Sequence, residues 1–409
     1  MKSFTSYLIE EALDKALPPS ARDAIVRVGG KIYQIGGVVR DEMLGKVSKD
    51  LDLLVVGVEL DKLGKALEPF GNVNLVGKSF GIIKFKPEGT TEEIDISIPR
   101  IDSKSTGKGH KDFEIKLGKG ITLQQDQLRR DFWMNAMSKD IETGEVHDIE
   151  GRGKLDIENK VVRMINPQAF QDDPLRMLRA VQFAARFNFK IEPVTYNEIK
   201  KNVKLLKTVS AERFQEEFVK LFTKSKSPSY GLKLMVELGM MKVLFSQVKK
   251  IDKRVLDKIG KVYFPVFLGV LLQDYGKQAG TVAQKTMKVS NDVAESVNGV
   301  VRVILDKKIM SDEVKLVDWG GALPSHVIDN IDGYLLTIKA NPLSKVLNDM
   351  RKKGKPTSLK ELPINGRDLM GLGIKGTKIG STLRWALEYS IRNGGQTREE
   401  LLKIIQKDV

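Results

Sequence analysis

The sequence predicts an α+β protein, with a small mixed β-sheet and a few helices in its N-terminal third and helices in the remainder. Three observations lead to this prediction. Short β-branched and leucine-rich runs recur before residue 140, and apolar residues at helical spacing dominate after residue 159. A chain of 409 residues is also too long for one domain of ordinary size.

The individual elements follow from apolar spacing and from the residues that bound each run. The predicted strands are residues 32–35, 51–56, 81–85 and 94–98. The predicted helices are residues 4–17, 38–45, 175–187, 211–222 and 230–244. The sheet is expected to end near Asp140, and the Lys-, Gly- and Ser-rich stretch 99–111 is expected to be a mobile, exposed loop. Residues 352–360 are interpreted as a connection into a final helical segment.

The charge balance indicates a polyanionic partner. Lys and Arg number 68 against 53 Asp and Glu, a formal net charge of +15. Such an excess favours nucleic acid and, less often, an anionic membrane surface; the plain alternative is a soluble basic protein. No segment approaches the ~20 apolar residues of a membrane span, and the N-terminus lacks the apolar core of a signal peptide. The cytoplasm is therefore the expected location.

The residue types present restrict the chemistry of any site. The chain has no cysteine, which excludes disulfides, thiolate zinc sites and a cysteine nucleophile. The three histidines, His110, His147 and His326, are far apart in sequence, and His147 is followed by Asp148. A metal site would therefore be built from carboxylates, which suits Mg²⁺.

Asp50 and Asp52 open the apolar strand predicted at 51–56. Residues i and i+2 of a strand point to the same face, so their carboxylates should project together and repel each other unless a cation lies between them. Asp95, on another predicted strand, could complete the cluster. Three carboxylates can hold two Mg²⁺ ions on a nucleoside triphosphate, whereas a D-x-D pair alone could equally be a solvated strand end.

A glycine pair precedes these carboxylates. Gly36 and Gly37 fall at the predicted strand-to-helix turn, where glycine lets the backbone approach a phosphate closely. Arg40 follows in the predicted helix and adds a fixed donor for a phosphate oxygen. A G-G turn ahead of D-x-D is more specific for nucleotide chemistry than either part alone.

These motifs resemble those of the bacterial-type CCA-adding enzymes and their relatives, the bacterial poly(A) polymerases. Residues 36–45 followed by Asp50-Leu51-Asp52 resemble the first motif of that family. The segments similar to its later motifs are RRDFWMNA at 129–136, residues 148–163 with one extra residue near 151–153, DDPLRMLR at 172–179, residues 210–217, and the tail segment 362–380. The order and spacing also agree with the family.

The resemblance implies a division of the chain into parts with different tasks. The implied parts are an N-terminal helical extension at 1–30, a catalytic nucleotidyltransferase head at 31–140, a helical neck at 141–222, a helical body at 223–345 and a helical tRNA-binding tail at 346–409. In the tail, Lys375 and Lys378 beside glycines would contact tRNA phosphates. The alternative is a compact helical hairpin with incidental lysines.

The resemblance also implies that Asp173 and Arg176 recognise the incoming base. Asp173 followed by Pro174 fits a helix cap, and Arg176 and Arg179 then share its face of the helix. A carboxylate and a guanidinium match the exocyclic amine and ring nitrogen that cytosine and adenine share. Taken alone, the pattern could be an ordinary cap with two solvated arginines. Asp172 stands where the family often has Glu, and Gln182 where some members have a third arginine.

In the second motif, the resemblance implies that Arg129 or Arg130 contacts the triphosphate and that Asp131 and Asn135 order the nucleotide pocket. Helix and loop capping is the alternative for the latter two.

The implied activity is addition of C, C and A to the 3' end of tRNA from CTP and ATP, with two Mg²⁺ ions and no evident membrane or obligate protein partner. A poly(A) polymerase is the first alternative. Those enzymes usually carry a basic-basic-Phe-apolar-apolar-His signature, whereas KSFGII at 78–83 has no histidine. The retained stretch 100–111 argues against a CC-only enzyme, and A-only addition stays open. An inactive RNA-binding protein is opposed by the intact carboxylates.

Overall fold

The structure is a computed structural model that describes residues 13–46, 51–77, 80–102, 115–225, 227–249, 256–258, 263–306, 308–321 and 323–408. The chain divides into two compact units. The first contains Met1–Ser210 and Lys233–Val243, and the second contains Ala211–Leu232 and Leu244–Val409. The finer division into head, neck, body and tail remains a prediction.

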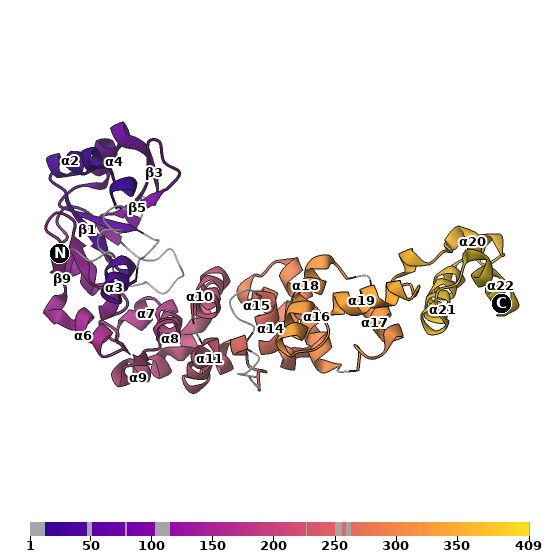
Figure 1. Cartoon of the computed structure of the whole chain (residues 1–409). Helices are drawn as coiled ribbons and strands as arrows, with labels where there is room; N and C mark the ends of the chain where they lie inside the picture. The colour runs from indigo at the N-terminus through magenta and orange to yellow at the C-terminus, as the bar shows by residue number, and fades with distance from the viewer. Residues whose placement is uncertain are drawn as a thin grey trace. The chain divides into compact units, whose positions relative to one another are not determined.

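A seven-stranded mixed sheet lies at the centre of the first unit (Figure 1), in the order β3-β4-β5-β2-β1-β8-β9. Its strands are β1 (Lys31–Ile35), β2 (Asp52–Val56), β3 (Gly71–Gly77), β4 (Ile82–Pro87), β5 (Ile94–Ser97), β8 (Ser138–Asp140) and β9 (Val146–His147). β2 and β5 are parallel, while the other neighbours are antiparallel. The mixed sheet and the four predicted strands are confirmed, but the sheet extends to His147 rather than ending near Asp140.

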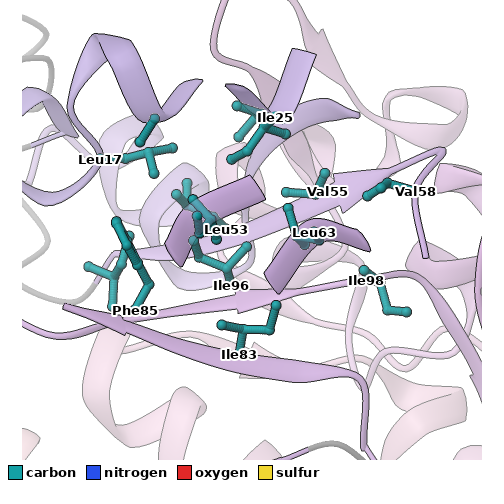
Figure 2. Close-up of a cluster of buried hydrophobic side chains, with 14 of the residues drawn as sticks. Leu17, Ile25, Leu53, Val55, Val58, Leu63, Ile83, Phe85, Ile96 and Ile98 are labelled. Atoms are coloured by element: carbon teal, nitrogen blue, oxygen red, sulfur yellow. The ribbon is translucent and has the colours of Figure 1, made fainter. Parts of the chain in front are cut away.

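Apolar side chains on the strands pack against two helices, α2 (Pro19–Arg27) and α4 (Leu60–Leu67). Figure 2 shows Leu53, Val55 and Ile96 of the sheet beside Ile25 and Leu63 of these helices, all buried. Full burial of such a side chain stabilises the fold by about 1.5–3 kcal/mol. This packing holds β2 against the two helices, and Asp52 is the first residue of that strand.

Two short sheets were not predicted. β6 (Arg100–Asp102) pairs with β7 (Ile115–Leu117), so the stretch expected to be a loop from residue 99 begins with a strand. Residues 103–114 of that stretch lie outside the described residues. β10 (Val161–Val162) pairs with β11 (Lys190–Ile191) and interrupts the region expected to be almost continuously helical. β-branched residues supply three of its four positions, a composition typical of strands.

The helices of the first unit include those that carry the predicted site. They are α3 (Gly37–Met43), α5 (Leu123–Leu128), α6 (Arg152–Glu158), α7 (Ala169–Asp172), α8 (Leu175–Phe187) and α9 (Pro193–Asn202). The helix predicted at 38–45 is confirmed as α3, and Gly45 beyond its end has φ +68°. α8 has the predicted bounds. Residues 13–16 are helical, and the rest of the helix predicted at 4–17 lies outside the described residues.

The second unit is helical throughout its described residues. Its helices include α10 (Ala211–Lys224), α14 (Phe264–Leu271), α15 (Ala279–Met287), α16 (Asn291–Leu305), α17 (Glu313–Gly320), α18 (Ser325–Thr337), α19 (Leu343–Lys352), α20 (Gly366–Gly371), α21 (Thr377–Asn393) and α22 (Arg398–Asp408). A single helix predicted at 230–244 is wrong. The structure instead has α11 (Pro228–Glu237) and α12 (Met240–Leu244), of which residues 233–243 belong to the first unit, because Gly239 between the two helices adopts φ +78°.

No helix among the described residues is both long enough and apolar enough to cross a membrane.

Candidate active site

The residues of the first motif meet where β1 stops and β2 starts. Gln34 of β1 pairs with Leu53 of β2 in antiparallel register, so the turn after Ile35 lies beside the first residue of β2. In the parallel pair of β2 and β5, Asp52 lies directly opposite Asp95. Side chains paired in this way share one face of the sheet. The two carboxylates therefore project together at this end of the sheet.

Lys84 on β4 accompanies these carboxylates. It pairs with Asp95 across the β4–β5 ladder, and its Nζ lies 3.3 Å from Asp95 Oδ1 and 2.9 Å from Glu93 Oε1. The hydrogen bond to Glu93, followed by the one to Asp95, raises the pKa of Lys84 above its usual value. The side chain of Asp95 is 47% exposed and Asp52 is also exposed, so this end of the sheet is accessible to a ligand.

The donor set fits a divalent cation. Two exposed carboxylates on neighbouring strands supply the oxygen ligands that Mg²⁺ takes, usually through one or two carboxylates together with substrate phosphates. Within the described part of the chain no three His, Cys, Asp or Glu side chains gather closely enough to hold a metal by themselves. Asp50, the third expected carboxylate at this end, lies outside the described residues.

The glycine turn of the first motif connects β1 to α3. Gly36 has φ 65° and ψ −119°, a conformation that strains any residue with a side chain. A Cβ at Gly36 would also lie only 3.1 Å from Arg130 Nη1. The positive φ favours glycine here, and a side chain would also displace the end of Arg130; α3 then begins at Gly37.

Arg40, which the sequence predicted to donate to a phosphate oxygen, lies inside the protein. The residue is only 4% exposed. Its Nη1 donates to Asn135 Oδ1 at 2.6 Å and its Nε to Asp41 Oδ1 at 2.8 Å. Burial lowers the pKa of Arg40 from its usual range, although the neighbouring Asp41 opposes this shift. These partners lie within the protein because α3 turns this face toward η3 (Trp133–Asn135) and α8.

The two arginines of the second motif share a carboxylate that the sequence analysis missed. Asp126 on α5 is fully buried, and its oxygens lie 2.7 Å from Arg129 Nη2 and 2.9 Å from Arg130 Nη2. Burial alone would raise the pKa of Asp126, but the charges and hydrogen bonds of Arg130 and Arg129 outweigh it and lower that pKa. The i, i+3 and i, i+4 spacing of D-x-x-R-R was the available sequence signal.

Asp131 is buried, and both of its carboxylate oxygens accept hydrogen bonds. Oδ1 accepts from the amide of Phe132 at 2.8 Å and from Asn135 Nδ2 at 3.0 Å, and Oδ2 accepts from Arg179 Nε at 2.8 Å. Burial alone would raise the pKa of Asp131, but the charge of Arg179 and the hydrogen bond from Asn135 outweigh it, so the pKa is lowered. Asp131 and Asn135 therefore connect the second motif to α8.

The start of α8 carries the two residues expected to recognise a base. Asp173 has extended backbone angles, and its Oδ1 accepts from the amide of Leu175 at 3.2 Å, while Pro174 already has helical angles. Arg176 Nη2 donates to the carbonyl oxygen of Arg129 at 2.7 Å. The start of α8 thus lies against the backbone of the second motif, and both predicted side chains lie there together.

In the second unit, Lys375 and Lys378 are exposed at the start of α21, next to Gly376 with φ +62°. Their predicted contact with tRNA phosphates stays a prediction.

Comparison with known families identifies two segments of the chain. Residues 32–163 match the family model described as the poly A polymerase head domain. Residues 188–252 match the model described as a probable RNA- and SrmB-binding site of polymerase A.

Among curated proteins, the multifunctional CCA protein of Nitrosomonas europaea is 42% identical over 176 residues, covering 42% of this chain and 39% of that protein. The multifunctional CCA protein of Haemophilus influenzae is 38% identical over 226 residues, covering 53% of this chain and 50% of that protein. The chain therefore spans half or less of the length of these relatives.

Solved structures match over nearly the whole chain. The CCA-adding enzyme of Bacillus stearothermophilus in complex with CTP has a TM-score of 0.72 at 20% identity, covering 97% of this chain and 98% of that one. The Thermotoga maritima CCA-adding enzyme complexed with tRNA has a TM-score of 0.66 at 21% identity, covering 98% of both chains. The fold is that of CCA-adding enzymes, and the predicted fold class is confirmed.

Proposed function

We propose that this chain, whose residues 32–163 match the poly A polymerase head domain, adds C, C and A to the 3' end of tRNA. CTP and ATP are its substrates, and pyrophosphate is released. The observation that carries the proposal is the placement of Asp52 and Asp95 on one face of the sheet, next to the Gly36–Gly37 turn. The family is a class that normally uses a divalent metal.

In this proposal the 3'-hydroxyl oxygen of the RNA attacks the α-phosphorus of the triphosphate. A new bond forms between this oxygen and the α-phosphorus, the bond from the α-phosphorus to the oxygen that bridges it to the β-phosphate breaks, and the hydroxyl proton passes to water. Asp50 and Asp52 would hold the metal, with Asp95 completing the carboxylate face. Two bound Mg²⁺ ions would supply the charge that activates the hydroxyl and stabilises the leaving pyrophosphate. The triphosphate would lie at the glycine turn, where Arg130 Nη1 is close to Gly36, and Arg129 or Arg130 would contact it.

Base selection in this proposal belongs to Asp173 and Arg176. The carboxylate would accept a hydrogen bond from the exocyclic amine of C or A, and the guanidinium would donate to the adjacent ring nitrogen. Uracil and guanine present a carbonyl oxygen where the amine should be, and this oxygen would face the carboxylate. Such a contact discriminates by roughly 1–3 kcal/mol against a wrong base, so no nucleic-acid template is needed.

The remaining expectations belong to the same proposal. The head would span residues 31–140, the neck 141–222, the body 223–345 and the tail 346–409, in the cytoplasm. Lys375 and Lys378 would bind tRNA phosphates, which are common to every tRNA and carry little sequence information.

Poly(A) addition is a second candidate, favoured by the head-domain match itself. A single assay separates the candidates. The protein is incubated with a tRNA lacking its last three nucleotides and with a tRNA ending in CC, each nucleotide being offered alone and together, and the products are sequenced. We expect CCA to be added to the tRNA lacking its last three nucleotides and A to be added to the tRNA ending in CC. Long A tracts would support poly(A) addition, extension of the CC-ended tRNA alone would indicate an A-only enzyme, and no extension would contradict the proposal.

A further inference from the structure

Six polar side chains of the first unit form a closed ring that begins and ends on α8. In order around the ring they are Arg179, Asp131, Asn135, Arg40, Asp41 and Arg186. Two of them lie on α8, two on α3, and two in or just before η3. The ring therefore joins three segments that are far apart in the sequence.

The first half of the ring runs from α8 to η3. Arg179 Nε donates to Asp131 Oδ2 at 2.8 Å, and Asn135 Nδ2 donates to Asp131 Oδ1 at 3.0 Å. Asn135 then uses its own oxygen, Oδ1, to accept from Arg40 Nη1 at 2.6 Å. Donors and acceptors alternate at each of these links, so every hydrogen bond supports the orientation of the next one.

The second half returns from α3 to α8. Arg40 donates through Nε to Asp41 Oδ1 at 2.8 Å, and its Nη2 lies 2.7 Å from the same oxygen. The other oxygen of Asp41 lies 3.5 Å from Arg186 Nη2. Arg179 and Arg186 are seven residues apart, about two helical turns, so they lie on one side of α8.

An aromatic pair on α8 lies beside the ring. The guanidinium of Arg40 lies 5.2 Å from the ring centre of Phe183 and 4.7 Å from that of Phe187. Arg179 lies 5.1 Å from Phe183, and Arg186 lies 4.9 Å from Phe187. These contacts are within the range of cation–π attraction, so Arg40 is held against α8 by packing as well as through its polar partners.

Burial makes the ring act as one unit. Arg40, Asp41, Asp131 and Asn135 are each no more than 7% exposed. A charge in such surroundings that loses its partner is strongly unfavourable, because water cannot replace the lost contact. The two helices and η3 are thus held in one arrangement, and the loss of one hydrogen bond or ion pair of the ring alters the geometry of the others.

The ring connects two ends of the proposed site. α3 begins at the Gly36–Gly37 turn, where the triphosphate would lie, and α8 begins beside Asp173 and Arg176, where the base would be recognised. We infer that Arg40, Asp41 and Arg186 are positioning residues that set the base-recognition end of α8 relative to the glycine turn, and so contribute to the choice of C and A. This inference rests on the proposed function for its consequence, but not for its geometry.

The most informative variant is Arg186→Met. Arg186 is thirteen residues beyond Asp173, about 20 Å along the helix at 1.5 Å per residue, so its side chain does not touch the base. It is also partly exposed, with 24% of the side chain accessible, and its 3.5 Å contact with Asp41 is the longest link of the ring, so its removal is a mild way to open the ring. Arg40→Met is the stronger variant, and Arg186→Met keeps the test open if that protein does not fold.

The matched control is Lys139→Met. Lys139 Nζ lies 2.7 Å from Glu42 Oε1, so this ion pair also anchors α3, but on the side of β8 and outside the ring. A merely structural loss of α3 packing would lower turnover with CTP and UTP in proportion. A positioning role changes their ratio instead.

The experiment measures kcat/KM for CTP and for UTP on a tRNA lacking its last three nucleotides. We expect the CTP preference to fall about tenfold in Arg186→Met and further in Arg40→Met, and to be unchanged in Lys139→Met. Combined, Arg40→Met and Arg186→Met should show less than the product of their separate effects. An unchanged preference in both ring variants of an active protein would overturn the inference, whereas an inactive wild-type protein would contradict the proposed function.

Hydrogen exchange tests the ring independently of activity. Arg186→Met should speed exchange at the amides of residues 134–136, far along the chain from the substitution, and of residues 175–178 at the other end of α8, and Lys139→Met should not. Faster exchange confined to the last turn of α8 would show that the ring does not transmit the change, and would overturn the inference even in a protein with no measurable activity.

Discussion

The two sides of the proposed site differ in the burial of their carboxylates. Beside α8, Asp126 and Asp131 are buried and each is bound by arginine. At the end of the sheet, Asp52 and Asp95 are exposed, and Lys84 pairs with Asp95 from a position that is itself 43% exposed. The buried carboxylates already have arginine partners within the protein, so the buried side is suited to keep its segments in fixed positions. The exposed side is suited to exchange a cation and a triphosphate.

The largest expected effect is at the exposed side. Asp52→Ala should lower the single-turnover rate of nucleotide addition by about 10³-fold or more, because metal stabilisation of the transition state is worth several kcal/mol. Affinity for tRNA, measured by filter binding, should change little, since phosphate contacts elsewhere supply most of it. Asp50→Ala should behave in the same way. Turnover within a few-fold of wild type for either variant would refute the metal assignment.

The buried side should dominate stability instead. Asp126→Asn leaves Arg129 and Arg130 without their buried counter-charge, and breaking such a pair costs about 3–5 kcal/mol. The midpoint of the first unit's urea transition should therefore fall sharply. Asp95→Asn is the matched control, because an exposed ion pair contributes only about 0–1 kcal/mol. Equal shifts of the urea midpoint in the two variants would contradict the proposed difference in stability between the buried and the exposed side.

The pH dependence of stability should come from the buried side as well. The folded-state pKa of Asp131 is lowered, so between that value and the unfolded value of about 3.9 the unfolded chain binds more protons. The stability contributed by Asp131 is present above pH about 4 and is lost as pH falls through the folded pKa. Asp131→Asn should flatten the urea-midpoint profile below pH 4 relative to wild type. An unchanged profile would mean that Asp131 titrates normally.

The smallest effect is expected in the second unit. Lys375→Ala combined with Lys378→Ala should weaken tRNA binding modestly and reduce the slope of log affinity against log salt, by about one for each lost phosphate contact. The choice between C and A should not change. Lys403→Ala, an exposed lysine on α22, is the control. The same salt slope in all three proteins would make these lysines incidental.

The spacing of apolar residues along the chain predicted the elements whose bounds depend on the local sequence. α8 has its predicted bounds because its apolar residues keep helical spacing and Asn188 ends it with φ +57°. β3 was missed because Gly71–Gly77 contains two glycines and two asparagines and is held by pairing with β4. The split between α11 and α12 depends on the backbone of Gly239, which the apolar pattern does not reveal.

The same limit applies to the site. The sequence placed Asp95 only on another predicted strand, and the structure pairs it with Asp52 on the neighbouring strands β2 and β5. The role of Arg40 was predicted from its place in a motif, but its partner Asn135 is 95 residues away in sequence. Arg186 was not singled out, because only the packing of α3 against α8 brings it to Asp41. Motifs indicated the chemistry, and tertiary contacts decided which side chains face a ligand.

The central claim is that one protein site selects C and A without a template, through Asp173 and Arg176. The most direct test offers all four nucleoside triphosphates together to a tRNA lacking its last three nucleotides and sequences the products of wild type and Arg176→Ala. The account predicts CCA from the wild type and a mixture containing U or G from the variant, with triphosphate affinity reduced far less than selectivity. An Arg176→Ala enzyme that still adds only C, C and A in order would contradict it.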